Sequence, residues 1–412
     1  MPRLLMHAPA FSITRIGVVA QVGHSPRFYA LMSFALPITM AALLLSTARN
    51  AIAASAFSGQ HGVGLVAIGA TIGGGLSGIL AGSLTDRFSP RALFVITNFG
   101  LATGTGILWL CVVHSFGSEP GLILLSLIDG GLIALSSTAL VKLQSELVPQ
   151  EAKGAAETLS GIRASAGSLI GVALGSQLDN RTDAILLAMI FFALVAITIL
   201  AFTRNVDAAM QGPRGAGSLL DLLSALRGNR ALRDVVIADL LMFLCLPSAL
   251  IALGVAAEGI ESLNPALLTA GIVGVLAGRL LVAARGTKGA VPRDLTIATV
   301  TYSLFAFLSF IALINHWLFH NVIALVAVAT IGSACGSFVQ ALLSAKFQEN
   351  LPGQLRGRGS GMMYGARSLQ LTLGISIATW VISRVSLHGY LIYVGVVLLL
   401  VTCGLRGFRR IA

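Results

Sequence analysis

The sequence predicts an all-α membrane protein with about twelve transmembrane helices in two pseudo-symmetric six-helix bundles. Of its 412 residues, 56% are hydrophobic and only 10% are charged, whereas soluble domains carry about 25% charged residues. Apolar runs recur with short gaps, and each is long enough to cross a hydrocarbon core of about 30 Å as a helix. A loop motif from the first half of the chain also returns in the second half.

Twelve apolar runs define the expected spans. They lie at 31–57, 62–83, 92–114, 121–142, 158–178, 184–203, 235–256, 265–284, 295–315, 322–343, 361–382 and 388–405. Helices are expected because a lone strand cannot satisfy its backbone hydrogen bonds in lipid. The runs are too long and too uniform for the alternating strands of a membrane barrel.

Basic residues in the loops expected on the cytoplasmic side account for the net charge of +11. With the N-terminus in the cytoplasm, most Lys and Arg residues fall on the inner side, and the outer loops keep only Arg181 and Arg384 among several acids. This asymmetry satisfies the positive-inside rule only for an even number of spans. We therefore expect a multi-pass protein of the bacterial inner membrane with both termini in the cytoplasm, and no binding of nucleic acid.

The chain divides into two halves around a polar linker. The expected parts are a cytoplasmic N-terminal segment, a first bundle, a linker with a short amphipathic helix near Leu219 to Leu226, a second bundle and a tail: 1–30, 31–203, 204–234, 235–405 and 406–412. The pattern E-x-x-P-x-x-x-[KR]-G occurs at 146–154 and again at 349–357, an offset of 203 residues. Parallel repeats of six spans predict two bundles with a cavity between them.

The loop after the second span carries the most specific motif. It reads Gly82-Ser-Leu-Thr-Asp86-Arg87-Phe-Ser-Pro-Arg91 and resembles the loop signature of the major facilitator superfamily at Gly82, Asp86, Arg87 and Arg91, although Ser89 and Pro90 depart from it. The resemblance implies a conformational latch formed by these four residues on the cytoplasmic side. In the second half, 274–278 echoes 78–82 but lacks the following Asp.

The fifth span contains regularly spaced glycines, Gly161, Gly167, Gly171 and Gly175. This spacing is similar to the glycine-rich fifth helix of the superfamily's proton antiporters, but the expected proline is absent. Close helix packing explains the glycines equally well. Together with the repeated loops, the pattern resembles the branch of bacterial drug and siderophore exporters.

Charged residues inside the spans are the candidate site, since a charge near a span centre costs roughly 2.5–3.5 kcal/mol on insertion scales. We expect Arg49, Asn50 and Arg163 to bind substrate, and Asp129 and Asp239 to couple transport to protons, because a carboxyl group that leaves water favours its neutral form. A structural Asp129–Arg163 ion pair is the alternative. Asp239 and Arg367 are expected near the cytoplasmic boundary.

The expected function is secondary active transport by alternating access, with proton-coupled export of a small organic molecule, either an amphiphilic drug or an anionic siderophore-like metabolite. Proton-coupled uptake is the alternative, and a membrane-embedded enzyme is a remote one. No ATP-binding phosphate loop is present. We expect no enzymatic activity, no cofactor and no metal, since His316 and His320 suit the membrane interface. The expected partners are substrate, protons and lipid, with the chain a monomer.

Overall fold

The computed structural model describes three quarters of the predicted spans. The described residues are 19, 22–23, 25–56, 60–115, 118–178, 180–202, 219–230, 232–240, 263–285, 322–352 and 355–384. Within these ranges the regular structure is helical throughout. The ninth and twelfth predicted spans, most of the seventh, both termini and the His316–His320 pair lie outside the described residues.

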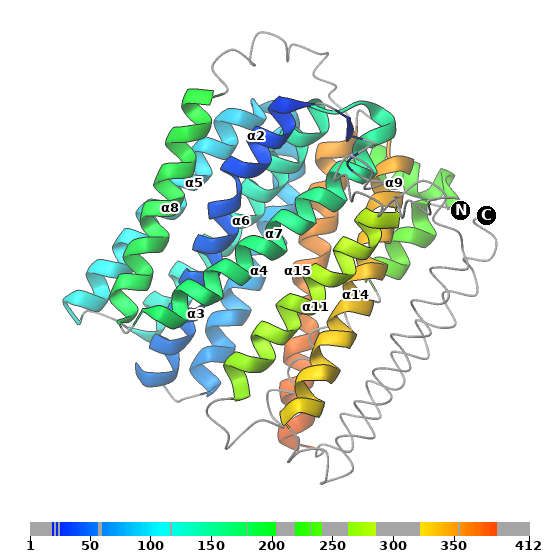
Figure 1. Ribbon diagram of the computed structural model, residues 1–412. Helices are drawn as coiled ribbons and strands as arrows, with labels where there is room; N and C mark the ends of the chain where they lie inside the picture. Colours follow the sequence, from blue (N-terminus) through cyan, green and yellow to red (C-terminus); the bar gives the residue numbers. More distant parts are fainter. Residues whose placement is uncertain are drawn as a thin grey trace, which may run out of the picture.

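All six spans of the first half are present as helices, and each lies within a few residues of its predicted run (Figure 1). They are α2 (Pro26–Phe34) with α3 (Leu36–Ala56), α4 (Gln60–Arg87), α5 (Pro90–Val113), α6 (Glu119–Glu146), α7 (Lys153–Gln177, after the short η2, Gln150–Ala152) and α8 (Arg181–Phe202). Ser89 and Ser118 cap α5 and α6, with a proline in the first turn of each helix. A proline fits there because the first-turn N–H has no helical partner.

The first span is broken at Ala35, which separates α2 from α3. Pro37 lies directly after this break. Its ring lacks the N–H that would continue the hydrogen-bond ladder. The break leaves the carbonyl oxygen of Ala35 open to a side-chain donor.

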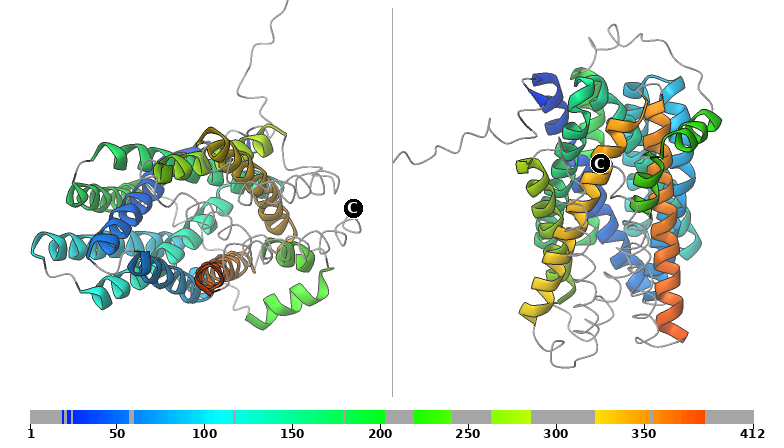
Figure 2. Two further views of the ribbon diagram at one scale, coloured as in Figure 1. Left: turned by 90° about the horizontal axis from the view of Figure 1, so that it is seen from below. Right: turned by 90° about the vertical axis from the view of Figure 1, so that its right-hand side faces the viewer.

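The second half contributes α11 (Leu263–Arg285), α14 (Val322–Asn350) and α15 (Arg356–Arg384), which match the predicted eighth, tenth and eleventh spans. The predicted linker helix is α9 (Leu219–Gly228), and residues 232–240 are also helical. Seen along the helix axes, α4 lies beside α15 and α7 lies near α11, so the two halves meet along both pairs (Figure 2).

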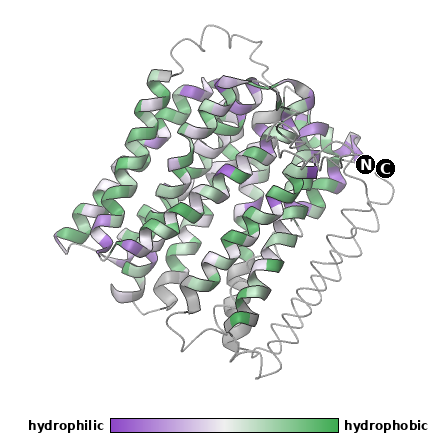
Figure 3. Cartoon of the chain, viewed as in Figure 1, coloured by the Kyte–Doolittle hydropathy of each residue, from purple (hydrophilic) through white to green (hydrophobic). Residues whose placement is uncertain are grey.

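One end of the bundle carries most of the described basic residues. Here α4 joins α5, α6 joins α7 and α14 joins α15, and Arg87, Lys153 and Arg356 lie at these junctions. We call this end the basic end; it is the side predicted to be cytoplasmic. Between the ends the helices are strongly apolar (Figure 3). Five described segments are long and apolar enough to cross a membrane by themselves: Pro26–Ala53, Gly64–Thr85, Pro90–Val113, Glu119–Glu146 and Arg181–Ala201.

The helix α7 is not among these five, and its position explains why. It packs against α3 of its own half and against α11 and α14 of the other half. A Cβ atom on Gly167 would lie 2.9 Å from the Leu36 carbonyl oxygen, and one on Gly171 would lie 2.9 Å from that of Met40. The glycines therefore serve close packing against α3, and a helix enclosed by protein needs less apolar surface.

Glycine contacts also reveal the internal repeat. A Cβ on Gly73 of α4 would lie 1.9 Å from the Leu127 carbonyl oxygen of α6, and one on Gly274 of α11 would lie 2.2 Å from that of Thr330 of α14. Leu127 and Thr330 are 203 residues apart, which is the offset of the loop motif, and Gly73 and Gly274 are 201 apart. The second and fourth spans of each half thus cross in the same way.

We predict that Gly73→Ala destabilises the protein, because the added methyl group would overlap the backbone of α6, and overpacking costs about 1–3 kcal/mol. Gly64→Ala is the control, since Gly64 lies on the same helix with open space around its Cβ position. Thermal unfolding in detergent should show a lower midpoint for Gly73→Ala only. Equal midpoints would mean that this crossing adjusts without cost.

Candidate functional site

Arg49 of α3 and Asp129 of α6 form a buried ion pair within the first half. The Arg49 Nη2 donates a hydrogen bond to the Asp129 Oδ2. Arg49 is only 5% exposed and Asp129 only 1%. Two charges removed from water can be tolerated when they neutralise each other, whereas either one alone would carry its full desolvation cost. The pair therefore fixes the first span against the fourth.

The surroundings of Asp129 leave part of its carboxylate unused. Its second oxygen, Oδ1, accepts no hydrogen bond from the described residues. The Arg49 Nε likewise donates none to them. Gly104 of α5 makes room for this oxygen, since a Cβ on Gly104 would lie 2.8 Å from Oδ1. A proton can therefore be added at Oδ1 without displacing a hydrogen bond to the described part of the chain.

A second buried ion pair lies in the other half. Arg367 of α15 binds Asp239 through two hydrogen bonds, from Nε to Oδ2 at 2.7 Å and from Nη2 to Oδ1 at 2.6 Å. Its Nη2 also donates to the Ser344 hydroxyl of α14 at 2.8 Å. Arg367 lies eleven residues into α15, about 16 Å along the axis. The pair is therefore in the half of α15 that is nearer the basic end.

The structure separates the other predicted substrate residues from Asp129. Arg163 of α7 donates through Nη1 to the carbonyl oxygen of Ala35, at the break between α2 and α3. It does not form the Asp129–Arg163 pair considered from the sequence, because Arg49 holds that carboxylate. Asn50 follows Arg49 on α3 and is half-buried.

The four predicted latch residues take different positions at the basic end. Gly82 lies against the other half, where a Cβ on Gly361 of α15 would come 2.5 Å from the Gly82 nitrogen. Arg91 is buried, and its Nη2 donates to the Leu200 carbonyl oxygen at 2.6 Å, near the end of α8 in its own half. Arg87 is exposed, and Asp86 lies on α4 with its side chain outside the described part.

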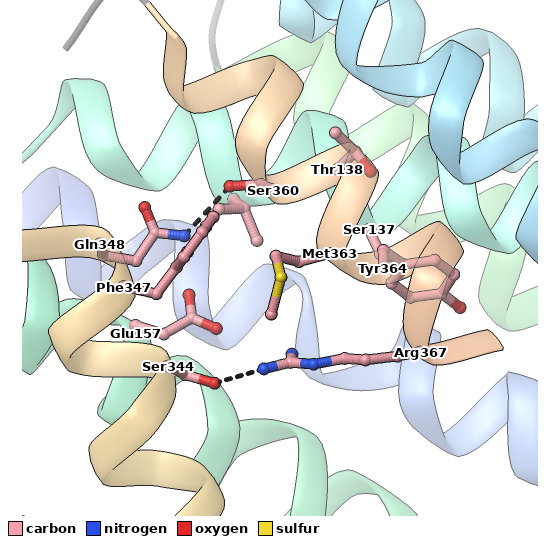
Figure 4. Close-up of a pocket in the computed structure, with 11 residues that line it drawn as sticks. Ser137, Thr138, Glu157, Ser344, Phe347, Gln348, Ser360, Met363, Tyr364 and Arg367 are labelled. Carbon is pink, nitrogen blue, oxygen red and sulfur yellow. Dashed lines mark hydrogen bonds between the residues drawn. The ribbon is translucent and has the colours of Figure 1, made fainter. Parts of the chain in front are cut away.

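A cavity of about 80 Å³ lies between the two halves near the basic end (Figure 4). This is room for several water molecules, since each needs at least about 10–15 Å³ by the same measure. Its walls come from α6, α7, α14 and α15, and polar residues are the majority among them: Ser137, Thr138, Val141, Glu157, Ser344, Phe347, Gln348, Ser360, Met363, Tyr364 and Arg367. Glu157 of α7 and Arg367 of α15 thus line one cavity from opposite halves.

Sequence reasoning missed two charged residues at this interface. Glu157 lies one residue before the predicted fifth span, but α7 begins at Lys153, so Glu157 is already helical. Arg279 lies inside the predicted eighth span but is absent from the predicted site residues; it is six residues before the end of α11. Signals were present in both cases, because each residue is a charge beside a long apolar run.

The fold and these charges define a class of protein. Two bundles of membrane-spanning helices related by an internal repeat, with a cavity between them, form a multi-pass membrane transporter that works as a secondary carrier rather than an enzyme. The chain belongs to the Major Facilitator Superfamily, whose family model matches residues 27–374. Members of this family bind small-molecule substrates within the membrane, often together with protons.

Solved structures with the same fold agree with this assignment. The E. coli fucose:proton symporter FucP matches with a TM-score of 0.67 and 18% sequence identity, over 92% of this chain and 97% of that chain. The human organic anion transporter MFSD10 (TETRAN) matches with a TM-score of 0.64 and 17% identity, over 93% of this chain and 100% of that chain. A search among curated protein sequences finds no significant match.

We predict that Arg49→Met destabilises the protein strongly, by about 3–5 kcal/mol, because it leaves the Asp129 charge buried without a partner. The double variant Arg49→Met with Asp129→Leu should recover most of the lost stability, since both charges are then gone. Thermal unfolding in detergent measures both. If the double variant is no more stable than the single one, the two charges do not compensate each other.

Proposed function

We propose that this carrier takes up a small organic molecule with a negative group together with protons, rather than exporting it, and that Asp129 is a proton-coupling residue. The observation that carries the proposal is the buried Arg49–Asp129 pair with its free carboxylate oxygen. Protonation of Asp129 would remove its charge and free Arg49 to bind an anion. The anion and the ionised Asp129 carboxylate then compete for one arginine, so a proton and an anion favour each other's binding, which is the linkage that proton symport requires.

The charge balance of the interior supports an anionic substrate. Arg91 and Arg358 are buried near the first residues of α5 and α15, at the basic end. Further inside the bundle the described charged side chains are four arginines and three carboxylates: Arg49, Arg163, Arg279, Arg367, Asp129, Glu157 and Asp239. The described part of the interior therefore has more positive than negative charges. A substrate with a carboxylate or phosphate group would neutralise this excess, whereas a cationic drug would add to it. Arg49, beside the half-buried Asn50, is the proposed contact, and Arg163 would add to the positive field.

The proposed site uses paired charges in both halves. The Asp239–Arg367 pair is a second candidate for proton coupling, but both of its carboxylate oxygens already accept hydrogen bonds from Arg367. Asp129 has one free oxygen and is therefore the better proton acceptor. Two structures with the same fold are named as a proton symporter and an organic anion transporter, which is consistent with a proton-coupled anion carrier. The proposal itself rests on the buried charges.

We predict that Asp129→Asn abolishes substrate-driven proton movement while the protein still reaches the membrane, because the Asn oxygen can still accept the hydrogen bond from Arg49. Purified protein in proteoliposomes would be given carboxylate-rich metabolites and cationic drugs under an imposed pH gradient. Wild type should move protons in the same direction as the carboxylate-rich substrate, and Asp129→Asn should not. Asp183→Asn is the matched control, because Asp183 is exposed at the other end of the bundle.

Three results would count against parts of the proposal. Proton and substrate movement in opposite directions would show export by exchange instead of symport. A response to cationic drugs alone would remove the anionic substrate. Normal coupling in Asp129→Asn would remove Asp129 from the proton path.

A further inference from the structure

The two halves meet at two equivalent crossings that differ in one side chain. Where α4 crosses α15, a Cβ on Gly78 would lie 2.6 Å from the Gly365 nitrogen, so the two backbones are in contact. The offset of 201 residues that relates Gly73 to Gly274 also relates Gly78 to Arg279. Where α11 crosses α7, the repeat therefore has an arginine in place of a glycine.

The Arg279 guanidinium occupies a notch that exists in α7 because residue 161 is glycine. A Cβ on Gly161 would overlap the Arg279 Nη1, and it would lie 2.5 Å from the Cζ and 3.1 Å from the Nε. The three atoms that lie nearest to it outside the local backbone thus all belong to one guanidinium of the other half. The Arg279 Nε is itself buried. A side chain on residue 161 and the side chain of Arg279 would therefore have to occupy the same space.

The opposite side of α11 is fixed against its own half. A Cβ on Gly278 would overlap the Ala334 carbonyl oxygen of α14, so these two backbones are in contact. Beside this contact, the Ser337 hydroxyl of α14 donates to the Val275 carbonyl oxygen at 2.8 Å. Because packed interiors leave little empty space, α11 has no room on this side to move away from α7. Bulk added at the notch therefore acts on the contact between the halves.

The glycines that bring α7 against the second half lie in its first part, near the basic end. A Cβ on Gly154 would lie 3.2 Å from the Ala345 Cβ of α14, and Gly161 lies against Arg279 of α11. Further along the helix, Gly171 approaches α3 of its own half instead. Arg279 therefore fills the notch in a state in which the halves are in contact at the basic end.

We propose that Arg279 is a positioning residue for the transport cycle: its guanidinium enters the notch at Gly161 when the basic end closes, and leaves it when the basic end opens. A carrier built from two halves has to return them to the same relative position in each cycle. A large side chain that fits one notch sets this position, whereas contacts between glycines alone would let the helices slide. Position 161 has to be glycine, because any side chain there would take the place of the guanidinium.

This positioning role goes beyond the function proposed above. It concerns how the halves return to contact, and it holds for either direction of transport and for any substrate. No protonation step is involved, because arginine stays charged in proteins. The role can therefore be tested with neither a substrate nor a pH gradient.

Spin labels on both halves would measure whether the basic end closes. In a background without the native cysteines, they would be attached at Phe88→Cys and Ala284→Cys, two exposed positions at the basic end of different halves. Pulsed electron paramagnetic resonance in lipid nanodiscs would give the distance distribution for each variant. Gly161→Leu should raise the ratio of the longer to the shorter distance roughly tenfold over that of the wild type, because overpacking at the notch disfavours closure. Gly161→Leu with Arg279→Ala should return the ratio to the wild-type value, since the leucine then fits into the space that the guanidinium leaves.

Two further variants separate positioning from an effect on folding. Arg279→Ala alone should keep the shorter distance predominant but broaden its distribution, because the notch is then empty and the halves can slide. Ala173→Leu is the matched control, because Ala173 lies on the same helix with an exposed side chain, and it should behave as the wild type. If Gly161→Leu alone does not fold, recovery of folded protein in the double variant would show that the two side chains compete for one space, and the width measured for Arg279→Ala then decides.

Three outcomes would overturn the proposal: a Gly161→Leu distribution equal to that of the wild type, a double variant that keeps the longer distance, or an Arg279→Ala distribution as narrow as that of the wild type. Failure of the proposed symport would appear instead as absent proton flux in proteoliposomes, while these distances still differ between the variants. The two failures are thus distinguishable.

Discussion

Charges buried between the helices must find their partners inside the protein, and this constraint governs the arrangement of the bundle. Where water is absent, an unpaired charge costs more than most packing contacts can offset. Arg49 and Asp129 are 80 residues apart in sequence, and Asp239 and Arg367 are 128 apart, yet each pair is in direct contact. Each half thus contains one ionic link between distant spans. The links restrict which helix faces can turn toward the interior.

Glycine supplies the second constraint, because it decides how closely the helices approach. Lipid gives no hydrophobic force that drives helices together, so close packing of backbones has to do so. The same crossing recurs at Gly73 with Leu127 and at Gly274 with Thr330. The sequence comparison aligned 274–278 with 78–82, whereas the contacts align Gly274 with Gly73. With this five-residue difference, Arg279 of α11 is the residue equivalent to Gly78 of α4. The repeat therefore has an arginine in the second half where it has a glycine in the first.

Much of the fold was accessible from sequence, because the bilayer imposes a length and a composition on every span. The nine spans that the structure describes as α2 to α8, α11, α14 and α15 match their predicted runs, and the family assignment from the Gly82 to Arg91 loop is confirmed. The pairing of charges was not accessible. Arg49, rather than Arg163, reaches Asp129, since this depends on the rotation of each helix about its axis. That rotation is set by tertiary packing, such as Gly104 making room for the carboxylate, which no local pattern records.

An alternating carrier needs an interface between its halves that is specific but easily separated. The crossing of α4 with α15 meets the first need with Gly78, Gly82, Gly361 and Gly365, since backbones in contact fit closely but have few side chains to interlock. The crossing of α7 with α11 has a different property, because the Arg279 guanidinium of one half fills the space beside Gly161 of the other half. The two crossings therefore join the halves by different means, one through backbone contact between glycines and one through a charged side chain.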